Sequence, residues 1–136
     1  LITLVLLAVG LLGIAGLQLT GIKFTHNANV RYQAMLQATD MADRMRANLA
    51  GVAAGAYDNL SGIGSDPNCI ASRCSPTQMA QTDQFDWNSA NLRLLPQGAG
   101  TVTRNGNTYQ ITINWQEKEG TGTAETRQQL QMDIEP

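Results

Sequence analysis

The chain has 136 residues, a net charge of −2, two cysteines, one histidine and few aromatic residues. This length fits a membrane segment and one small domain, but not two domains. Nucleic acid is excluded as a direct partner, because binding it needs a basic surface and aromatic residues on which bases stack.

The first segment, residues 1–22, contains no charged side chain. As a helix, LITLVLLAVGLLGIAGLQL would span about 28 Å, close to the hydrocarbon thickness of a bilayer. A signal-peptide core would be shorter and followed by a small-residue cleavage site, whereas here the helical pattern continues. We therefore expect a transmembrane helix. Its candidate assembly residues are large apolar side chains and glycines that permit close approach of neighbouring helices: Leu4, Leu7, Gly10, Leu11, Gly13, Ile14, Gly16 and Leu17.

Residues 23–50 continue the helix with one apolar face and one polar face. Asp40 precedes Arg44 by one helical turn, which is the favourable order for an ion pair, and Gly51 is the predicted stop. The pattern over residues 1 to about 50 thus predicts one continuous helical rod with a length of about 75 Å. Its second half is expected to dock on a folded domain through Met35, Ala38, Ala42, Met45 and Leu49.

The two cysteines, Cys69 and Cys74, fit a short disulfide loop in an oxidising compartment, and free thiols in a cytosolic domain are the alternative. Closing the loop should stabilise the domain by about 2 kcal/mol. A zinc site would need more soft ligands than His26 supplies. Lys23 and Arg31 would place the following residues in the cytoplasm. The cysteines favour the opposite side, and we follow the cysteines.

The globular part, residues 51–136, begins with an irregular loop over residues 51–75, rich in small and polar residues. A helix is predicted over residues 76–95, because Ser75 can cap it, Pro76 suits its first position and Gln78 completes a capping box. The large apolar residues of this helix are irregularly spaced, which predicts loose packing on one side: Met79, Phe85 and Trp87.

An antiparallel sheet of three or more strands is predicted over residues 100–135. Apolar and polar residues alternate in TYQITINW, and Asn105-Gly106 is a strong hairpin signal that would place Val102 opposite Tyr109. A further strand with the same alternation follows the loop EKEGTGT. The predicted fold class is α+β, and the apolar residues of the two clearest strands are Tyr109, Ile111, Ile113, Trp115, Leu130, Met132 and Ile134.

The residues show no nucleophile motif, no phosphate-binding glycine loop and no cluster of metal ligands. We therefore predict no enzymatic activity, no cofactor, no metal and no small-molecule substrate. Asp83 and Asp86 stand one helical turn apart and are expected on a solvated face, and His26 is expected to be exposed or interfacial. Asp58 and Asp66 could bind calcium with backbone carbonyls, although they lack EF-hand spacing.

Four segments of the sequence resemble the type IV pilus minor pilins, and within them the PilV group. They are VLLAVGLLGIAGLQ, DMADRMRAN, CSPTQM and ITINW, which are spread from end to end of the chain. The resemblance implies the type IV pilin fold, a long N-terminal helix packed on a small antiparallel sheet. It also implies that residues 1–22 leave the bilayer for the core of a filament.

In that family a prepilin is cut before a phenylalanine, the new N-terminus is methylated, and a glutamate lies close to it. The sequence opens at Leu1 without these residues, and we expect them to precede it. The resemblance implies an inner-membrane protein with a single span and a periplasmic head, which later joins the pilus tip. The implied partners are other minor pilins, the major pilin and a large tip adhesin, in a priming complex that starts assembly and supports twitching motility and adhesion.

Two alternatives remain open at this stage. One is a minor pseudopilin of a type II secretion system, which shares the same architecture. The other is a periplasmic binding module with a single anchor that never enters a filament. The residues upstream of Leu1 would separate the binding module from the minor pilin and the pseudopilin.

Overall fold

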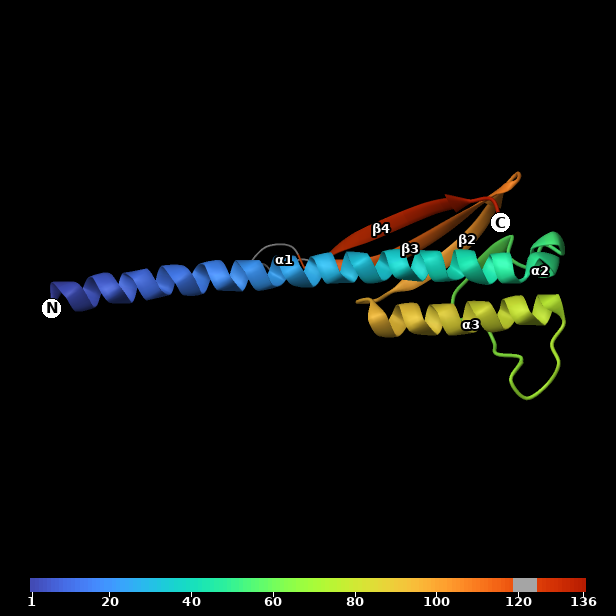
Figure 1. Ribbon diagram of the computed structural model, residues 1–136, viewed down its shortest axis with the longest axis horizontal. Helices are drawn as coiled ribbons and strands as arrows, with labels where there is room; N and C mark the ends of the chain where they lie inside the picture. The colour runs from blue at the N-terminus through green and yellow to red at the C-terminus, as the bar shows by residue number, and fades with distance from the viewer. Residues whose placement is uncertain (119–124) are drawn as a thin grey trace. The chain divides into compact units, whose positions relative to one another are not determined.

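The computed structural model describes residues 1–118 and 125–136. Within these residues the chain forms three helices and four strands (Figure 1). In chain order they are α1 (Ile2–Ala47), α2 (Leu49–Ala53), β1 (Asn59–Ser61), α3 (Pro76–Leu94), β2 (Ala99–Asn105), β3 (Thr108–Lys118) and β4 (Glu125–Ile134).

The structure divides into two compact units, the N-terminal unit (Leu1–Arg31) and the C-terminal unit (Tyr32–Pro136). The N-terminal unit is the first part of α1. The C-terminal unit contains the rest of α1 with all the other described helices and strands. A long N-terminal helix and a small antiparallel sheet are therefore present, which confirms the predicted α+β class.

In the C-terminal unit, α1 buries a narrow stripe made of small residues and methionines. Alanines at helical spacing let the helix lie close to its neighbours, and the unbranched methionines fill the remaining space. Met35 and Leu49 were expected in this stripe, but they are 53% and 56% exposed. Ala38, Ala42 and Met45 are buried as predicted, and Ala34 and Met41 take the place of the other two, so the stripe is rotated by only about a tenth of a turn.

Helix α1 ends at Ala47, and the prediction of Gly51 as its stop was wrong. The side-chain oxygen of Asn48 accepts a hydrogen bond from Gly51 N at 3.2 Å and so caps the short helix α2. Gly51 lies within α2, where an added Cβ would stand 2.9 Å from the carbonyl oxygen of Pro76. The glycine thus permits close approach to the start of α3.

The segment predicted as an irregular loop, residues 51–75, contains buried structure. Tyr57 is fully buried, and Leu60 in β1 is buried opposite Val102 of β2. The prediction was wrong here because a three-residue strand is too short to show an alternating pattern. A single tyrosine among small polar residues gives no periodic signal either.

Helix α3 begins as predicted, with a complete capping box between Ser75 and Gln78. Its inner face packs closely, so the prediction of loose packing was wrong. Asn88 accepts a hydrogen bond from Gly100 N at 2.7 Å and donates one to Gly100 O at 3.1 Å. The spacing is regular once small and polar residues are counted, because the buried residues are Ala80, Asp83, Trp87, Asn88 and Asn91.

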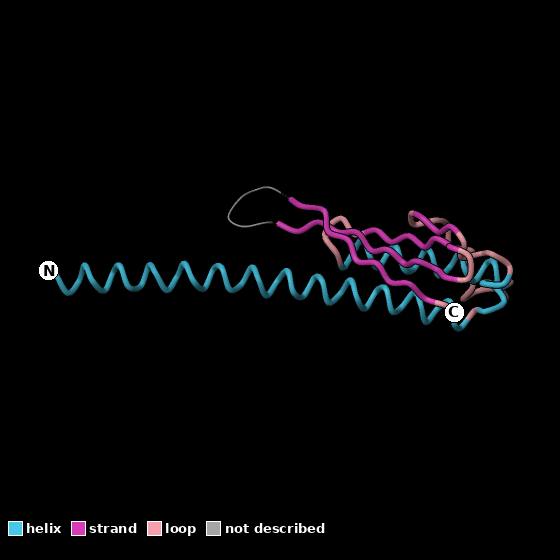
Figure 2. The backbone as a smooth tube through the Cα atoms, turned by 90° about the horizontal axis from the view of Figure 1, so that it is seen from above, coloured by secondary structure: helices cyan, strands magenta, loops and turns pink. Residues whose placement is uncertain are grey.

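The four strands form one antiparallel sheet in the order β1-β2-β3-β4 (Figure 2). The predicted alternation in β3 is confirmed, because Tyr109, Ile111, Ile113 and Trp115 are all buried. Strand β3 continues through Lys118, into the predicted loop EKEGTGT, and residues 119–123 of that loop lie outside the described residues. In β4 the alternation holds as well, with Leu130 and Met132 half-buried and Ile134 buried.

The turn between β2 and β3 is displaced from its predicted position. Asn105 pairs with Thr108, so the two turn residues are Gly106 and Asn107. Gly106 has a φ of +65°, and glycine at the first turn position suits a type II′ hairpin. Val102 therefore lies opposite Ile111 and not Tyr109. The shift is even-numbered, so every side chain keeps its predicted face.

Candidate assembly surfaces and their support

The N-terminal unit presents apolar side chains on every side of its helix. The predicted assembly residues Leu4, Leu7, Leu11, Ile14 and Leu17 are each more than half exposed. Around Gly10, Gly13 and Gly16 an added Cβ would meet no atom within 4 Å. Burying a leucine or isoleucine side chain is worth about 1.5–3 kcal/mol. This surface therefore favours an apolar environment of lipid or of other helices.

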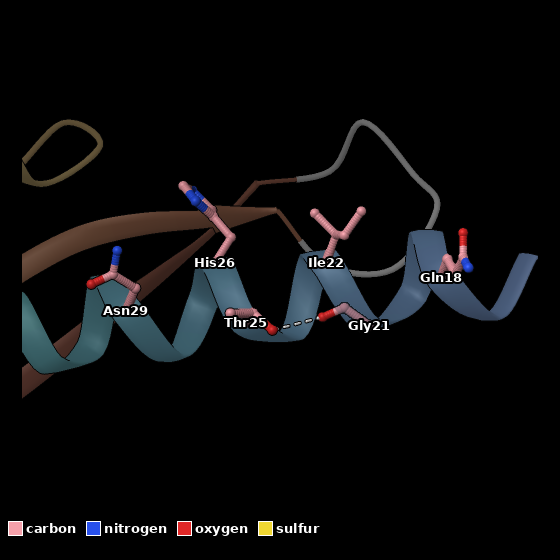
Figure 3. A pocket seen from close by; sticks show the side chains of 6 residues that line it. All are labelled: Gln18, Gly21, Ile22, Thr25, His26 and Asn29. Atoms are coloured by element: carbon pink, nitrogen blue, oxygen red, sulfur yellow. Dashed lines mark hydrogen bonds between the residues drawn. The ribbon is translucent and has the colours of Figure 1, made fainter. Parts of the chain in front are cut away.

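At the end of the apolar run, polar side chains gather along one flank of α1 (Figure 3). Gln18, Thr25, His26 and Asn29 border a hollow there together with Gly21 and Ile22. The Thr25 hydroxyl donates a hydrogen bond to Gly21 O in the preceding turn of the same helix, at 3.0 Å. His26 is exposed, and the described residues contain no group of three or more His, Cys, Asp or Glu able to hold a metal ion.

The two cysteines form a disulfide, with their Cα atoms 5.3 Å apart. The loop is anchored to α3, because the Thr82 hydroxyl donates to Cys69 Sγ at 3.0 Å. Asp66, once a candidate calcium ligand, accepts from Asn68 N at 2.8 Å and so shapes the turn before the disulfide. Ile70 at the tip of the loop is fully exposed.

A group of polar residues that we call the inner cluster (Arg44, Tyr57 and Asp83) joins α1, α3 and the segment before β1. The Tyr57 hydroxyl donates to Asp83 Oδ2, and Arg44 Nη1 donates to Asp83 Oδ1 at 3.1 Å. Arg44 Nε also donates to Asp40 Oδ2 at 2.9 Å, which confirms that predicted ion pair. Asp83 is buried, so its expected place on a solvated face was wrong, whereas Asp86 is exposed.

The environment of the inner cluster fixes its protonation. Burial raises the pKa of the Tyr57 hydroxyl well above its usual value, and its hydrogen bond to Asp83 raises it further. Burial alone would lower the pKa of Arg44, but the hydrogen bonds and charges of Asp40 and Asp83 outweigh it and raise the pKa. Tyr57 therefore stays neutral and Arg44 stays charged at neutral pH. These fixed protonation states suit a structural role better than proton transfer.

A second group, the outer cluster (Asp58, Arg104 and Tyr109), repeats this chemistry at the sheet. The Tyr109 hydroxyl donates to Asp58 Oδ1 at 2.8 Å, and Arg104 Nη1 lies 3.4 Å from Asp58 Oδ2. The Arg104 guanidinium also lies over the Tyr109 ring, 5.6 Å from its centroid. Burial, followed by the contact with Asp58, raises the pKa of Tyr109. Both oxygens of Asp58, the other candidate calcium ligand, are thus engaged by protein groups.

The sequence revealed the disulfide pair and the apolar helix but missed both clusters. One signal for Asp83 was available, because it lies between Ala80 and Trp87 at helical spacing on the buried face of α3. Tyr57 and Arg104 carried no comparable signal, since their aspartate partners, Asp83 and Asp58, are far away along the chain. Only the fold brings these residues together.

The comparison with known families accounts for this arrangement. Residues 16–85, slightly more than half of the chain, match the Tt1218-like family, described as type IV pilin Tt1218. The chain belongs to this type IV pilin family. Neither a curated protein nor a solved structure matches the chain.

As a type IV pilin, the chain has a pilin-like structural role and assembles with other pilus components. The matched residues run from the apolar part of α1 through the disulfide loop into α3, and so include Arg44, Tyr57 and Asp83. The apolar start of α1 fits a membrane anchor with a single span. The match identifies a type IV pilin, not the PilV group in particular.

Proposed function

We propose that this type IV pilin is a minor pilin of the PilV kind, a subunit of the complex that primes pilus assembly and remains at the pilus tip. In this role it supports twitching motility and adhesion. The observation that carries the proposal is the exposed apolar helix of the N-terminal unit in a chain that matches a pilin family. Such a helix needs lipid before assembly and neighbouring helices afterwards.

The C-terminal unit is proposed as a passive building block without catalytic activity. In support, the buried carboxylate Asp83 is engaged by Arg44 and Tyr57, and Asp58 is engaged by Arg104 and Tyr109. Contacts that hold the segments of the C-terminal unit together help a subunit to keep the shape of the surfaces that meet its neighbours. The proposed neighbours are other minor pilins, the major pilin and a large tip adhesin.

Deleting the gene tests this function most directly, with surface fibres counted by electron microscopy and the chain located by immunogold labelling. A priming subunit predicts few or no fibres without the chain, and label at one fibre end in the wild type. Label along the whole fibre would contradict the tip position. Normal fibres with impaired protein secretion would indicate a pseudopilin, and label confined to the membrane would indicate an anchored binding module.

A matched pair of substitutions tests whether the apolar helix carries the function. Leu11→Asp places a charge within the apolar run, at a cost of about 2.5–3.5 kcal/mol in a bilayer centre. We expect it to abolish complementation of the deletion. Ile70→Asp adds the same charge at a fully exposed position of the disulfide loop and should leave fibre number unchanged. Equal complementation by both variants would overturn the role assigned to the helix.

A further inference from the structure

Strand β4 forms one edge of the sheet, and the described residues pair its backbone on the β3 side alone. The pairing with β3 runs through all 10 residues of β4 without a bulge. At the opposite edge, β1 has only 3 residues and is covered by α3, whose Gln84 donates to Ser61 O at 2.7 Å. The two edges of the sheet are therefore protected very differently.

Strand β4 lacks the usual devices that keep an edge from pairing. Its sequence, ETRQQLQMDI, contains no proline, glycine or lysine. Its middle, residues 128–132, carries no charge. Proteins generally blunt exposed edges with such residues, with bulges or with short strands, because free backbone groups recruit another strand. An edge of this length, paired without a bulge and uncharged over residues 128–132, is suited to strand addition.

The helix-facing side of β4 is also incompletely covered. Leu130 and Met132 share this side with the buried Ile113 and Ile111, which they pair with directly, but they are only half-buried. In Figure 1, α3 and β4 lie on opposite sides of the part of α1 that belongs to the C-terminal unit. The sheet beneath α3 is shielded, whereas the sheet at β4 is partly open.

Helix α1 carries a further exposed apolar side chain in the C-terminal unit, Met35. Trp87 donates to Gln37 O at 2.8 Å and packs against Gly100, so Gln37 faces α3. Gly100 pairs with Ile113, which in turn pairs with Leu130. Met35, two residues before Gln37, points to the other flank of the helix and is 53% exposed.

The outward side of β4 adds a charge pattern. Arg127 and Asp133 are both exposed and lie on the same side of the strand, with Gln129 and Gln131 between them. A strand that pairs with β4 would be favoured by an acidic residue opposite Arg127 and a basic residue opposite Asp133. The pattern therefore favours one register of a partner strand and ties its direction to the order of its own charges: a basic residue before an acidic one suits antiparallel pairing.

We propose that β4 is a docking site for an extended segment of another polypeptide, which adds to the sheet as an antiparallel fifth strand. The segment alternates apolar and polar residues, with its apolar side chains over Leu130 and Met132. Its charges oppose Arg127 and Asp133. The inference concerns the C-terminal unit alone and does not depend on a position at the pilus tip.

Hydrogen exchange on the full chain in detergent micelles tests the proposal. The probe is the blocked peptide Lys-Val-Thr-Val-Thr-Val-Glu, whose lysine lies opposite Asp133 and whose glutamate lies opposite Arg127 in antiparallel pairing. At a concentration of about ten times its Kd, the peptide should slow hydrogen exchange about tenfold at the backbone amides of β4 that point away from β3. The same peptide with alternate N-methylated residues should give no protection, because it cannot form the ladder.

A charge swap provides the matched control, since both positions are exposed and the fold should be unaffected. The variant with Arg127→Asp and Asp133→Arg should bind the probe about tenfold more weakly and bind the reversed peptide, Glu-Val-Thr-Val-Thr-Val-Lys, about tenfold better. Absence of protection on β4, protection elsewhere, or equal binding of the N-methylated peptide would overturn the proposal. Equal binding of both peptides by both chains would overturn the assigned register.

Discussion

The same three residue types, an aspartate, an arginine and a tyrosine, fasten the C-terminal unit at two places. In the inner cluster, Asp83 is buried and its side chain is 10% exposed. In the outer cluster, the side chains of Asp58 and Arg104 are 38% and 42% exposed. Water can replace a lost partner in the outer cluster but not in the inner one. We therefore expect burial, more than the identity of the groups, to set what such a contact contributes to stability.

The comparison is tested most strongly by removing each aspartate in turn. Asp83→Ala leaves the Tyr57 hydroxyl and Arg44 without their acceptor, and we expect a loss of about 3 kcal/mol in the free energy of unfolding. Asp58→Ala should cost about 1 kcal/mol or less. Urea unfolding of the full chain in micelles, followed by the fluorescence of the buried Trp87 and Trp115, measures both. Similar losses would refute the role given to burial.

The disulfide lies on the connection between the two clusters, after Asp58 and before Asp83 in the chain. Replacing Cys69 and Cys74 together by serine should lower the free energy of unfolding by about 2 kcal/mol, because the unfolded chain regains the freedom of the loop. The same urea experiment, with and without reductant, measures it. Reductant should destabilise the wild type and leave the serine variant unchanged, and a wild type insensitive to complete reduction would contradict the prediction.

Alkaline pH separates the two tyrosines. The pKa of Tyr57 in the folded protein is raised well above its usual value of 10.0, so the unfolded chain loses this proton first. The contribution of Tyr57 to stability should therefore be constant below about pH 9 and be lost as pH rises through about 10 and beyond, since the folded state then binds more protons than the unfolded chain. Tyr57→Phe should lower stability at neutral pH by about 1 kcal/mol and flatten the alkaline decline.

Tyr109→Phe serves as the control for this pH dependence. The pKa of Tyr109 is also raised, but its partner Asp58 is half-exposed, so the variant should leave most of the alkaline decline in place. The urea midpoint measured between about pH 7 and 11 distinguishes the two variants. A decline that persists in Tyr57→Phe and disappears in Tyr109→Phe would reverse the assignment.

The parts of this fold that the sequence predicted are those encoded by neighbouring residues. Ser75, Pro76 and Gln78 specify the start of α3 within one turn, and the alternation from Tyr109 to Trp115 specifies a strand. The proximity of Cys69 and Cys74 made their disulfide readable in the same way. In each case the physical cause acts within a few residues, so the sequence contains it directly.

The parts that the sequence did not predict depend on contacts between distant segments. Asp83 is acceptable in the core only because Arg44, 39 positions away, and Tyr57 meet it there. The hairpin register shifted by two residues because the turn formed at Gly106 and Asn107, and both registers keep the same faces buried. Local patterns cannot decide between arrangements that satisfy them equally.

The smallest expected effect comes from the arginine of the outer cluster. Arg104→Met removes a half-exposed ion pair with Asp58 and the stacking on Tyr109, but it retains much of the apolar contact, so we expect a loss of about 0.5 kcal/mol. The matched variant Arg44→Met leaves the buried Asp83 without its cation and should cost about 2 kcal/mol. Added salt should reduce the first loss more than the second, because exposed charges are screened. If both losses respond equally to salt in urea unfolding, the inner cluster is as accessible to solvent as the outer one. The difference in burial between the two clusters would then not explain their contributions to stability.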